Sequence, residues 1–124
     1  MVETFLKAQS LAGSFGADIG CGNGKYIGVA DPAICPDLFY FGCDRSRSLV
    51  SIAHGLHPHA NLACADILSL PYRSASFDFV LSIAVIHHLN SEDRRLQALS
   101  EMTRIARPGA RILVFVWALE QKVT

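Results

Sequence analysis

The sequence has no cysteine pair spaced C-x-x-C, although it contains four cysteines. Such pairs are typical of zinc sites and redox centres, so their absence argues against a structural zinc site and indicates no disulfide framework. Scattered, reduced cysteines favour a reducing compartment, and we expect a protein of the cytosol or the nucleus. The four are Cys21, Cys35, Cys43 and Cys64.

The sequence also lacks any apolar run near the ~18 residues that a membrane-spanning helix needs. No basic flank followed by an apolar core stands at its N-terminus, so no secretory signal is expected. Charge of either sign is not in excess: the formal net charge is +0, and 51% of the residues are hydrophobic. This composition is typical of a globular domain, and residues 1–124 are enough for a single one.

What the sequence does have is a regular alternation of apolar segments and segments with helical periodicity. Strands are predicted at residues 16–20, 38–44, 60–66, 76–86 and 110–119. Helices are predicted at residues 25–30, 46–56 and 91–106, with Ser46 and Ser91 as caps and Pro108-Gly109 as the end of the last helix. Alternating strands and helices predict an α/β fold with a Rossmann-like, doubly wound and mostly parallel sheet.

The stretch ADIGCGNGKY, residues 17–26, places three glycines at alternate positions between the first predicted strand and the first predicted helix. Glycine allows a positive φ and lets a ligand approach the backbone closely. In doubly wound sheets, ligands bind beyond the carboxyl ends of the strands, where this stretch is expected to lie. The sequence therefore predicts a nucleotide-type cofactor over the glycine loop.

Three acids, Asp18, Asp44 and Asp66, stand at or just past predicted strand ends and suit a cationic ligand with hydroxyl groups. Asp44 follows the glycines by about 20 residues, the distance at which an acid binds a ribose. A dinucleotide fingerprint would need glycine or alanine where Lys25 stands, so NAD is disfavoured. S-adenosylmethionine, which carries an ammonium, a sulfonium and a ribose diol, fits the pattern better.

The motifs "DIGCGNGKY", "GCDRS", "CADILSLPY", "FDFVLSIAVIHHL" and "VWALEQK" together resemble the class I S-adenosylmethionine-dependent methyltransferases. More narrowly, they resemble the eukaryotic tRNA methyltransferases that esterify a carboxymethyl group on the wobble uridine, including the methyltransferase domain of the AlkB-type tRNA hydroxylase. The resemblance covers residues 18–122. It implies five strands of a seven-stranded fold, so the domain is expected to be truncated.

The resemblance implies positions for the cofactor, S-adenosylmethionine. The glycine loop would hold its methionine end, the acids after the second and third strands its ribose and adenine, and the end of the fourth strand would line it. The implied cofactor-binding residues are Asp18, Gly20, Cys21, Gly22, Asn23, Asp44, Arg45, Asp66, Ile67, Ile83 and Ala84.

The resemblance also implies that His88 and Trp117 act near the transferred methyl group. The alternatives are that one of His87 and His88 only packs against the strand before it, and that Trp117 belongs to the core. Cys21 is expected to be a small filler rather than a nucleophile. A carboxylate acceptor is ionised at neutral pH, so the transfer needs no general base.

The partners implied by the resemblance are the tRNA substrate and a small zinc-binding activator protein. The activator would add a strand beside residues 60–65, a weak strand that is expected to be an edge. Two alternatives stay open: a methyltransferase-like module that binds without turnover, and a class I methyltransferase with a different acceptor.

Overall fold

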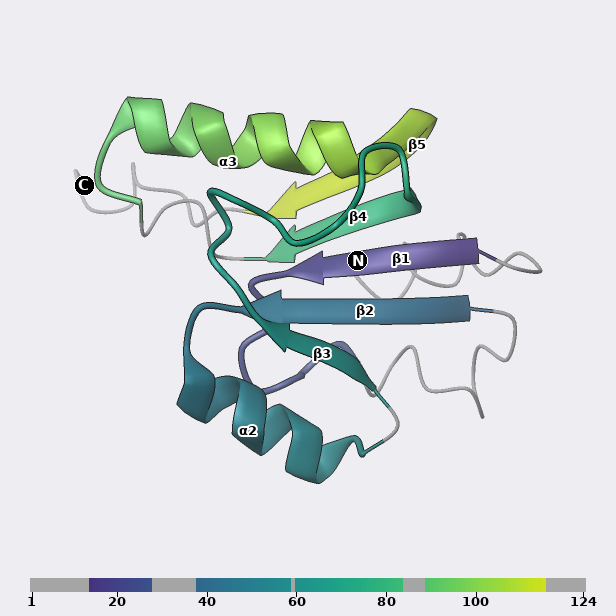
Figure 1. Cartoon of the computed structure of the whole chain (residues 1–124), viewed down its shortest axis with the longest axis vertical. Helices are drawn as coiled ribbons and strands as arrows, with labels where there is room; N and C mark the ends of the chain where they lie inside the picture. Colours follow the sequence, from purple (N-terminus) through teal and green to yellow (C-terminus); the bar gives the residue numbers. More distant parts are fainter. Residues whose placement is uncertain (1–13, 28–37, 59, 84–88, 116–124) are drawn as a thin grey trace, which may run out of the picture.

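The computed structural model describes residues 14–27, 38–58, 60–83 and 89–115. Its elements are β1 (Ser14–Ile19), β2 (Leu38–Asp44), α2 (Arg47–Leu56), β3 (Asn61–Cys64), β4 (Phe77–Ile83), α3 (Glu92–Ile105) and β5 (Ala106–Phe115). The strands form one sheet in the order β3-β2-β1-β4-β5, and every neighbouring pair is parallel. All arrowheads in Figure 1 therefore point to the same edge, and the predicted α/β Rossmann-like class is confirmed.

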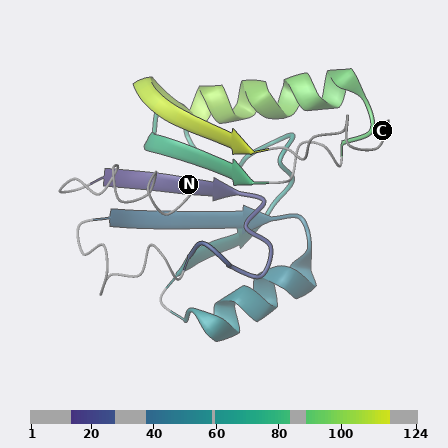
Figure 2. The same ribbon diagram turned by 180° about the vertical axis from the view of Figure 1, so that it is seen from behind.

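The two described helices cover opposite faces of this sheet. The chain steps outward from β2 to β3 in one direction and from β4 to β5 in the other, and right-handed crossovers then place their helices on opposite faces. In both views α2 lies beside β3 and α3 beside β5 (Figure 1 and Figure 2). The strand order changes direction between β1 and β4, which marks the place where ligands bind in such sheets.

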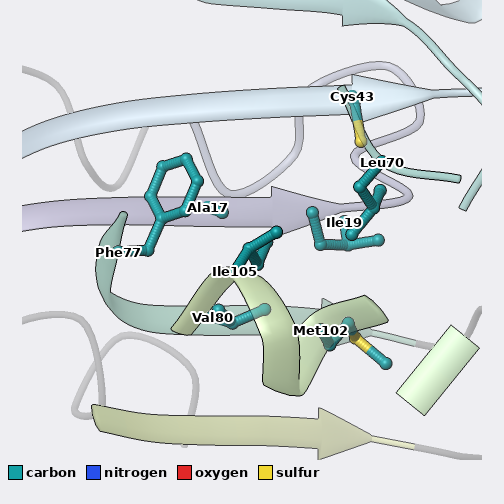
Figure 3. Close-up of a cluster of buried hydrophobic side chains, with 8 residues drawn as sticks. All are labelled: Ala17, Ile19, Cys43, Leu70, Phe77, Val80, Met102 and Ile105. Atoms are coloured by element: carbon teal, nitrogen blue, oxygen red, sulfur yellow. The ribbon is translucent and has the colours of Figure 1, made fainter. Parts of the chain in front are cut away.

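Two apolar clusters, one on each face, pack against the sheet, and one of them includes residues of α3. One contains Tyr40, Phe79 and Leu81, and the other, under α3, is drawn in Figure 3. Its members are Ala17, Ile19, Cys43, Leu70, Phe77, Val80, Met102 and Ile105. The successive residues Phe79, Val80 and Leu81 of β4 switch between the clusters because successive strand side chains point to opposite faces. The sheet between the clusters is thus buried on both sides.

Both helix starts agree with the prediction from sequence. The Ser46 hydroxyl accepts the amide of Leu49, and the Ser91 hydroxyl accepts the amide of Arg94, each at 3.2 Å. These bonds satisfy amides that have no partner inside the helix. No helix in the described ranges is long and apolar enough to cross a membrane.

Some predicted boundaries differ from the structure. Of the helix predicted at residues 25–30, residues 25–27 lie in turns closed by the bond from the Ile27 amide to the Gly24 carbonyl (3.1 Å), and residues 28–30 lie outside the described residues. The last helix was predicted to end at residue 106, and α3 ends at Ile105, but Pro108-Gly109 does not terminate it. The strand predicted from residue 110 begins at once, at Ala106. Pro108 and Gly109 instead lie in an irregularity of β5, where Gly109 has a φ of 83° and the register against β4 shifts.

Candidate cofactor site at the carboxyl edge of the sheet

The glycine loop after β1 is fastened to the end of β2. The amides of Gly20 and Cys21 both donate to the Cys43 carbonyl at 2.8 Å. Gly20, Gly22 and Gly24 have φ values of 80°, 56° and 88°, a region that residues with a Cβ rarely adopt. The alternating glycines are therefore required by the backbone of this turn.

Asp44, the last residue of β2, connects the glycine loop to the start of α2. One carboxylate oxygen accepts the Gly22 amide at 2.9 Å, and the other accepts the Ser46 amide at 2.8 Å. A carboxylate has about four lone-pair sites, so both oxygens keep capacity for a ligand. A Cβ added at Gly22 would meet no described heavy atom within 4 Å, so the loop is open beside this carboxylate.

A cavity of about 330 Å³ lies at this edge of the sheet, within the size range of small-molecule sites. Five of the predicted residues line it: Gly20, Asp44, Arg45, Asp66 and Ile67. The sequence reasoning missed the other lining residues, Cys43, Ala65, Leu68, Leu89 and Arg94. Three of these adjoin predicted residues in the chain, whereas Leu89 and Arg94 come from around the start of α3.

The charges around the cavity are mixed rather than acidic. Arg45 and Arg94 line it together with Asp44 and Asp66. One oxygen of Asp66 accepts the amide of Leu68 at 2.9 Å, which folds the start of the β3–β4 connection into a tight turn. The cavity therefore offers both acceptors and cationic donors, as a ligand with charges of both signs requires.

Asp18 is placed differently from the other two acids. Its side chain is 1% exposed on the face of β1 and lies outside the cavity lining. Burial raises the pKa of Asp18 to about 7, the Tyr40 hydroxyl opposes that rise, and the charge of Asp44 adds to it. Asp18 and Tyr40 influence each other's pKa, but Asp18 Oδ2 and the Tyr40 hydroxyl are both buried without a hydrogen bond of ordinary geometry to the described residues.

The cysteines near the loop are protected thiols. Burial, followed by the charges of Asp18 and Asp44, raises the pKa of Cys21 to about 12. Burial likewise raises the pKa of Cys43 to about 11. Neither thiol would ionise near neutral pH, which agrees with the prediction that Cys21 fills space. Among the described residues, no group of His, Cys, Asp and Glu side chains is arranged to hold a metal ion.

Of the remaining predicted residues, Cys21, Gly22 and Asn23 lie in the loop beside the cavity, and Ile83 ends β4. None of these four belongs to the cavity lining. Ala84, His88 and Trp117 lie outside the described residues. Their predicted roles therefore stay predictions.

The sequence was compared with protein families and with curated proteins. Residues 17–114 match the family model described as "Methyltransferase domain". The chain is 51% identical over 122 residues to the tRNA (carboxymethyluridine(34)-5-O)-methyltransferase of Schizosaccharomyces pombe. It is 50% identical over 121 residues to the tRNA (carboxymethyluridine(34)-5-O)-methyltransferase ALKBH8 of Mus musculus. Each match covers 98% of this chain but only 50% and 17% of the relative.

The fold was compared with solved structures. SAM-bound CalS10, an amino pentose methyltransferase from Micromonospora echinaspora, superposes with a TM-score of 0.83, at 18% identity over 97% of this chain and 50% of the other. A putative methyltransferase in complex with the Haloferax volcanii Trm112 methyltransferase activator gives a TM-score of 0.76, at 21% identity over 91% and 50% of the two chains. At these identities the likeness shows a shared fold.

Proposed function

This chain belongs to the methyltransferase domain family, and on that premise we propose that it is the core of a tRNA methyltransferase that uses S-adenosylmethionine. The proposed reaction is methyl esterification of a carboxymethyl group on the wobble uridine. The observation that carries the proposal is the cavity bounded by Gly20, Asp44 and Asp66 at the carboxyl edge of the sheet. The relatives at 50–51% identity, of which the chain spans half or less, suggest the acceptor.

The residues present fit this cofactor. Asp44 would accept the ribose hydroxyls with the lone pairs that the Gly22 and Ser46 amides leave free. Asp66 uses one oxygen for the Leu68 amide, so its other oxygen can accept the adenine amino group, while Ile67 offers an apolar contact. The open side of the glycine loop would receive the methionine end.

The bound cofactor would supply a methyl group already activated by the sulfonium. The protein's task is then to position the acceptor in line with that methyl group. A carboxymethyl acceptor is ionised at neutral pH, so no side chain has to remove a proton from it. We retain His88 and Trp117 as the residues proposed to contact the acceptor, on the family resemblance.

Methyl transfer from labelled S-adenosylmethionine to tRNA that carries carboxymethyluridine tests the function. A methyl ester releases labelled methanol in mild alkali, whereas a methyl group on nitrogen or carbon does not. The chain should be assayed with and without the activator, and calorimetry should show binding of S-adenosylmethionine but not of NAD. Binding of S-adenosylmethionine without methyl transfer, both with and without the activator, would favour a binding module. Label that is stable in alkali would indicate a different acceptor.

We also propose that the activator partner docks along β3, which lies at an edge of the described sheet. The Ala65 amide donates to Asp44 in β2 at 2.9 Å. Because successive amides of a strand alternate in direction, the amides of Leu62 and Cys64 point away from the sheet. On the neighbouring helix α2, Leu49, Ile52 and Leu56 are exposed at 37%, 51% and 63%. An unpaired edge beside apolar side chains is suited to strand addition.

Cys64→Pro should abolish co-purification with the activator, because proline removes an outward amide of β3 without removing a bond to β2. Cys64→Ala keeps that amide and is the matched control, expected to retain the complex. Circular dichroism of both variants should match the parent protein. A Cys64→Pro variant that still binds the activator at normal affinity would place the docking surface elsewhere.

A further inference from the structure

Residues 65–76 connect β3 to β4 without a helix or strand of their own. We call them the β3–β4 segment. Its first four residues, from Ala65 to Leu68, line the cavity. In Figure 1 the segment leaves the end of β3 and runs beside α3 before it enters β4. One wall of the cavity is therefore an irregular stretch whose position must be fixed by bonds to its neighbours.

Side chains of α3 supply bonds to the backbone of this segment. Gln97 Nε2 donates to the Leu68 carbonyl at 3.0 Å. One turn further, Glu101 accepts the Leu70 amide at 2.8 Å, and Arg104 donates to the Leu70 carbonyl at 3.1 Å. Arg104 also donates to the Tyr72 carbonyl at 2.8 Å and pairs with Glu101 at 2.6 Å. Three residues of one helix thus hold three carbonyls and one amide of the segment.

Gln97 differs from the other two in what it holds. The Leu68 carbonyl belongs to a residue of the cavity wall. In that wall Ile67 lies between Asp66, whose carboxylate closes the turn, and Leu68, whose carbonyl accepts the bond from Gln97. Glu101 and Arg104 hold a later part, which carries the buried Leu70 into the core. The local turn alone fixes Asp66 relative to Leu68, and the Gln97 bond fixes the turn relative to α3.

We propose that Gln97 is a positioning residue for the cofactor cavity: it holds the wall made by Asp66, Ile67 and Leu68 against α3. This inference rests on the proposed function for the identity of the ligand. The wall is the part predicted to contact adenine, so Gln97 acts on the adenosine half of the cofactor. Gln97 is exposed, while Ala98, Met102 and Ile105 anchor α3 in the core, so its removal leaves the packing of α3 intact.

Variants at Gln97 separate the hydrogen bond from the size of the side chain. Gln97→Glu keeps the shape but loses the donor, and Gln97→Lys keeps a donor on a chain that reaches the carbonyl. Ser100→Glu adds the same charge to an exposed position of α3 and is the control. All are measured in the full chain, by calorimetry with S-adenosylmethionine and with adenosine, and by amide exchange without ligand.

Gln97→Glu should weaken binding of S-adenosylmethionine and of adenosine by the same factor, about fivefold, as expected for the loss of one hydrogen bond. The Leu68 and Ser69 amides should exchange at least about fivefold faster, because the turn opens more often. Gln97→Lys and Ser100→Glu should stay within about twofold of the parent protein in every measurement.

Unchanged exchange in Gln97→Glu would overturn the inference, and so would faster exchange with unchanged affinity. An equal loss in Ser100→Glu would attribute the effect to charge and overturn it as well. If the parent protein binds no S-adenosylmethionine, the proposed function fails. The exchange rates then still decide whether Gln97 holds the wall, so the two failures are distinguishable.

Discussion

Asp44→Ala should weaken binding of S-adenosylmethionine by about 10- to 150-fold, or ~1.5–3 kcal/mol, the range for hydrogen bonds to a charged group. The substitution removes the proposed ribose acceptor and also frees the Gly22 and Ser46 amides that the carboxylate now holds. The loop would then lose its connection to α2 as well as its contact with the ligand. Calorimetry well below the unfolding temperature measures the loss.

Asp44→Asn refines this test, because an amide keeps one acceptor oxygen where the carboxylate has two. Its affinity should fall between those of the parent protein and Asp44→Ala. Asp93→Ala, at an exposed acid in the first turn of α3, controls for the loss of a negative charge and should bind normally. Normal affinity in Asp44→Ala would remove Asp44 from the proposed site.

The buried Asp18 should make stability depend on pH. Its folded pKa of about 7 lies above the ordinary value of 3.8, so between these values the folded protein keeps a proton that the unfolded chain has lost. The free energy of unfolding should therefore fall as the pH rises from about 4 to 7, and level off above 7. The expected decrease is on the order of 4 kcal/mol.

Urea unfolding of the parent protein and of Asp18→Asn across this pH range measures the effect. The variant cannot ionise, so its stability should change much less with pH and should exceed that of the parent protein above about pH 7. Asp93→Asn, at the exposed position, should keep the pH dependence of the parent. Parallel curves for the parent protein and Asp18→Asn would show that Asp18 does not cause the slope.

The elements with strong local patterns were predictable from the sequence. The uninterrupted apolar run of β2 was placed from Leu38 to Asp44, as observed, and the serine caps began both described helices as predicted. The start of β5, predicted at residue 110 but observed at Ala106, was not predictable, because it depends on a distant partner. Ala106 pairs with Phe77 in β4, so the chain becomes a strand before it reaches Pro108.

The site was predictable only where the position of a residue at a strand end decides its place. Asp44 and Asp66 come at or after the ends of their strands, and position in the chain was enough to bring them to one edge. Asp18 pairs with Gly42 and Leu81 inside the sheet, so its side chain points into a covered face. Arg94 could not be foreseen, since no local pattern shows that the first turn of α3 reaches the cavity of β2 and β3.

The pairing of β1 with β4 has a consequence for folding kinetics. Gly16 pairs with Phe79, so the centre of the sheet joins residues far apart in sequence, whereas the strand pairings within β1–β2–β3 and within β4–α3–β5 span much shorter separations. Units with the shorter separations can form first, and their docking is then the slow step with the highest contact order. The cavity takes Gly20 and Asp44 from one unit and Leu89 and Arg94 from the other. A ligand bound there spans the seam, so the two halves cannot separate until it leaves, and its binding stabilises their association.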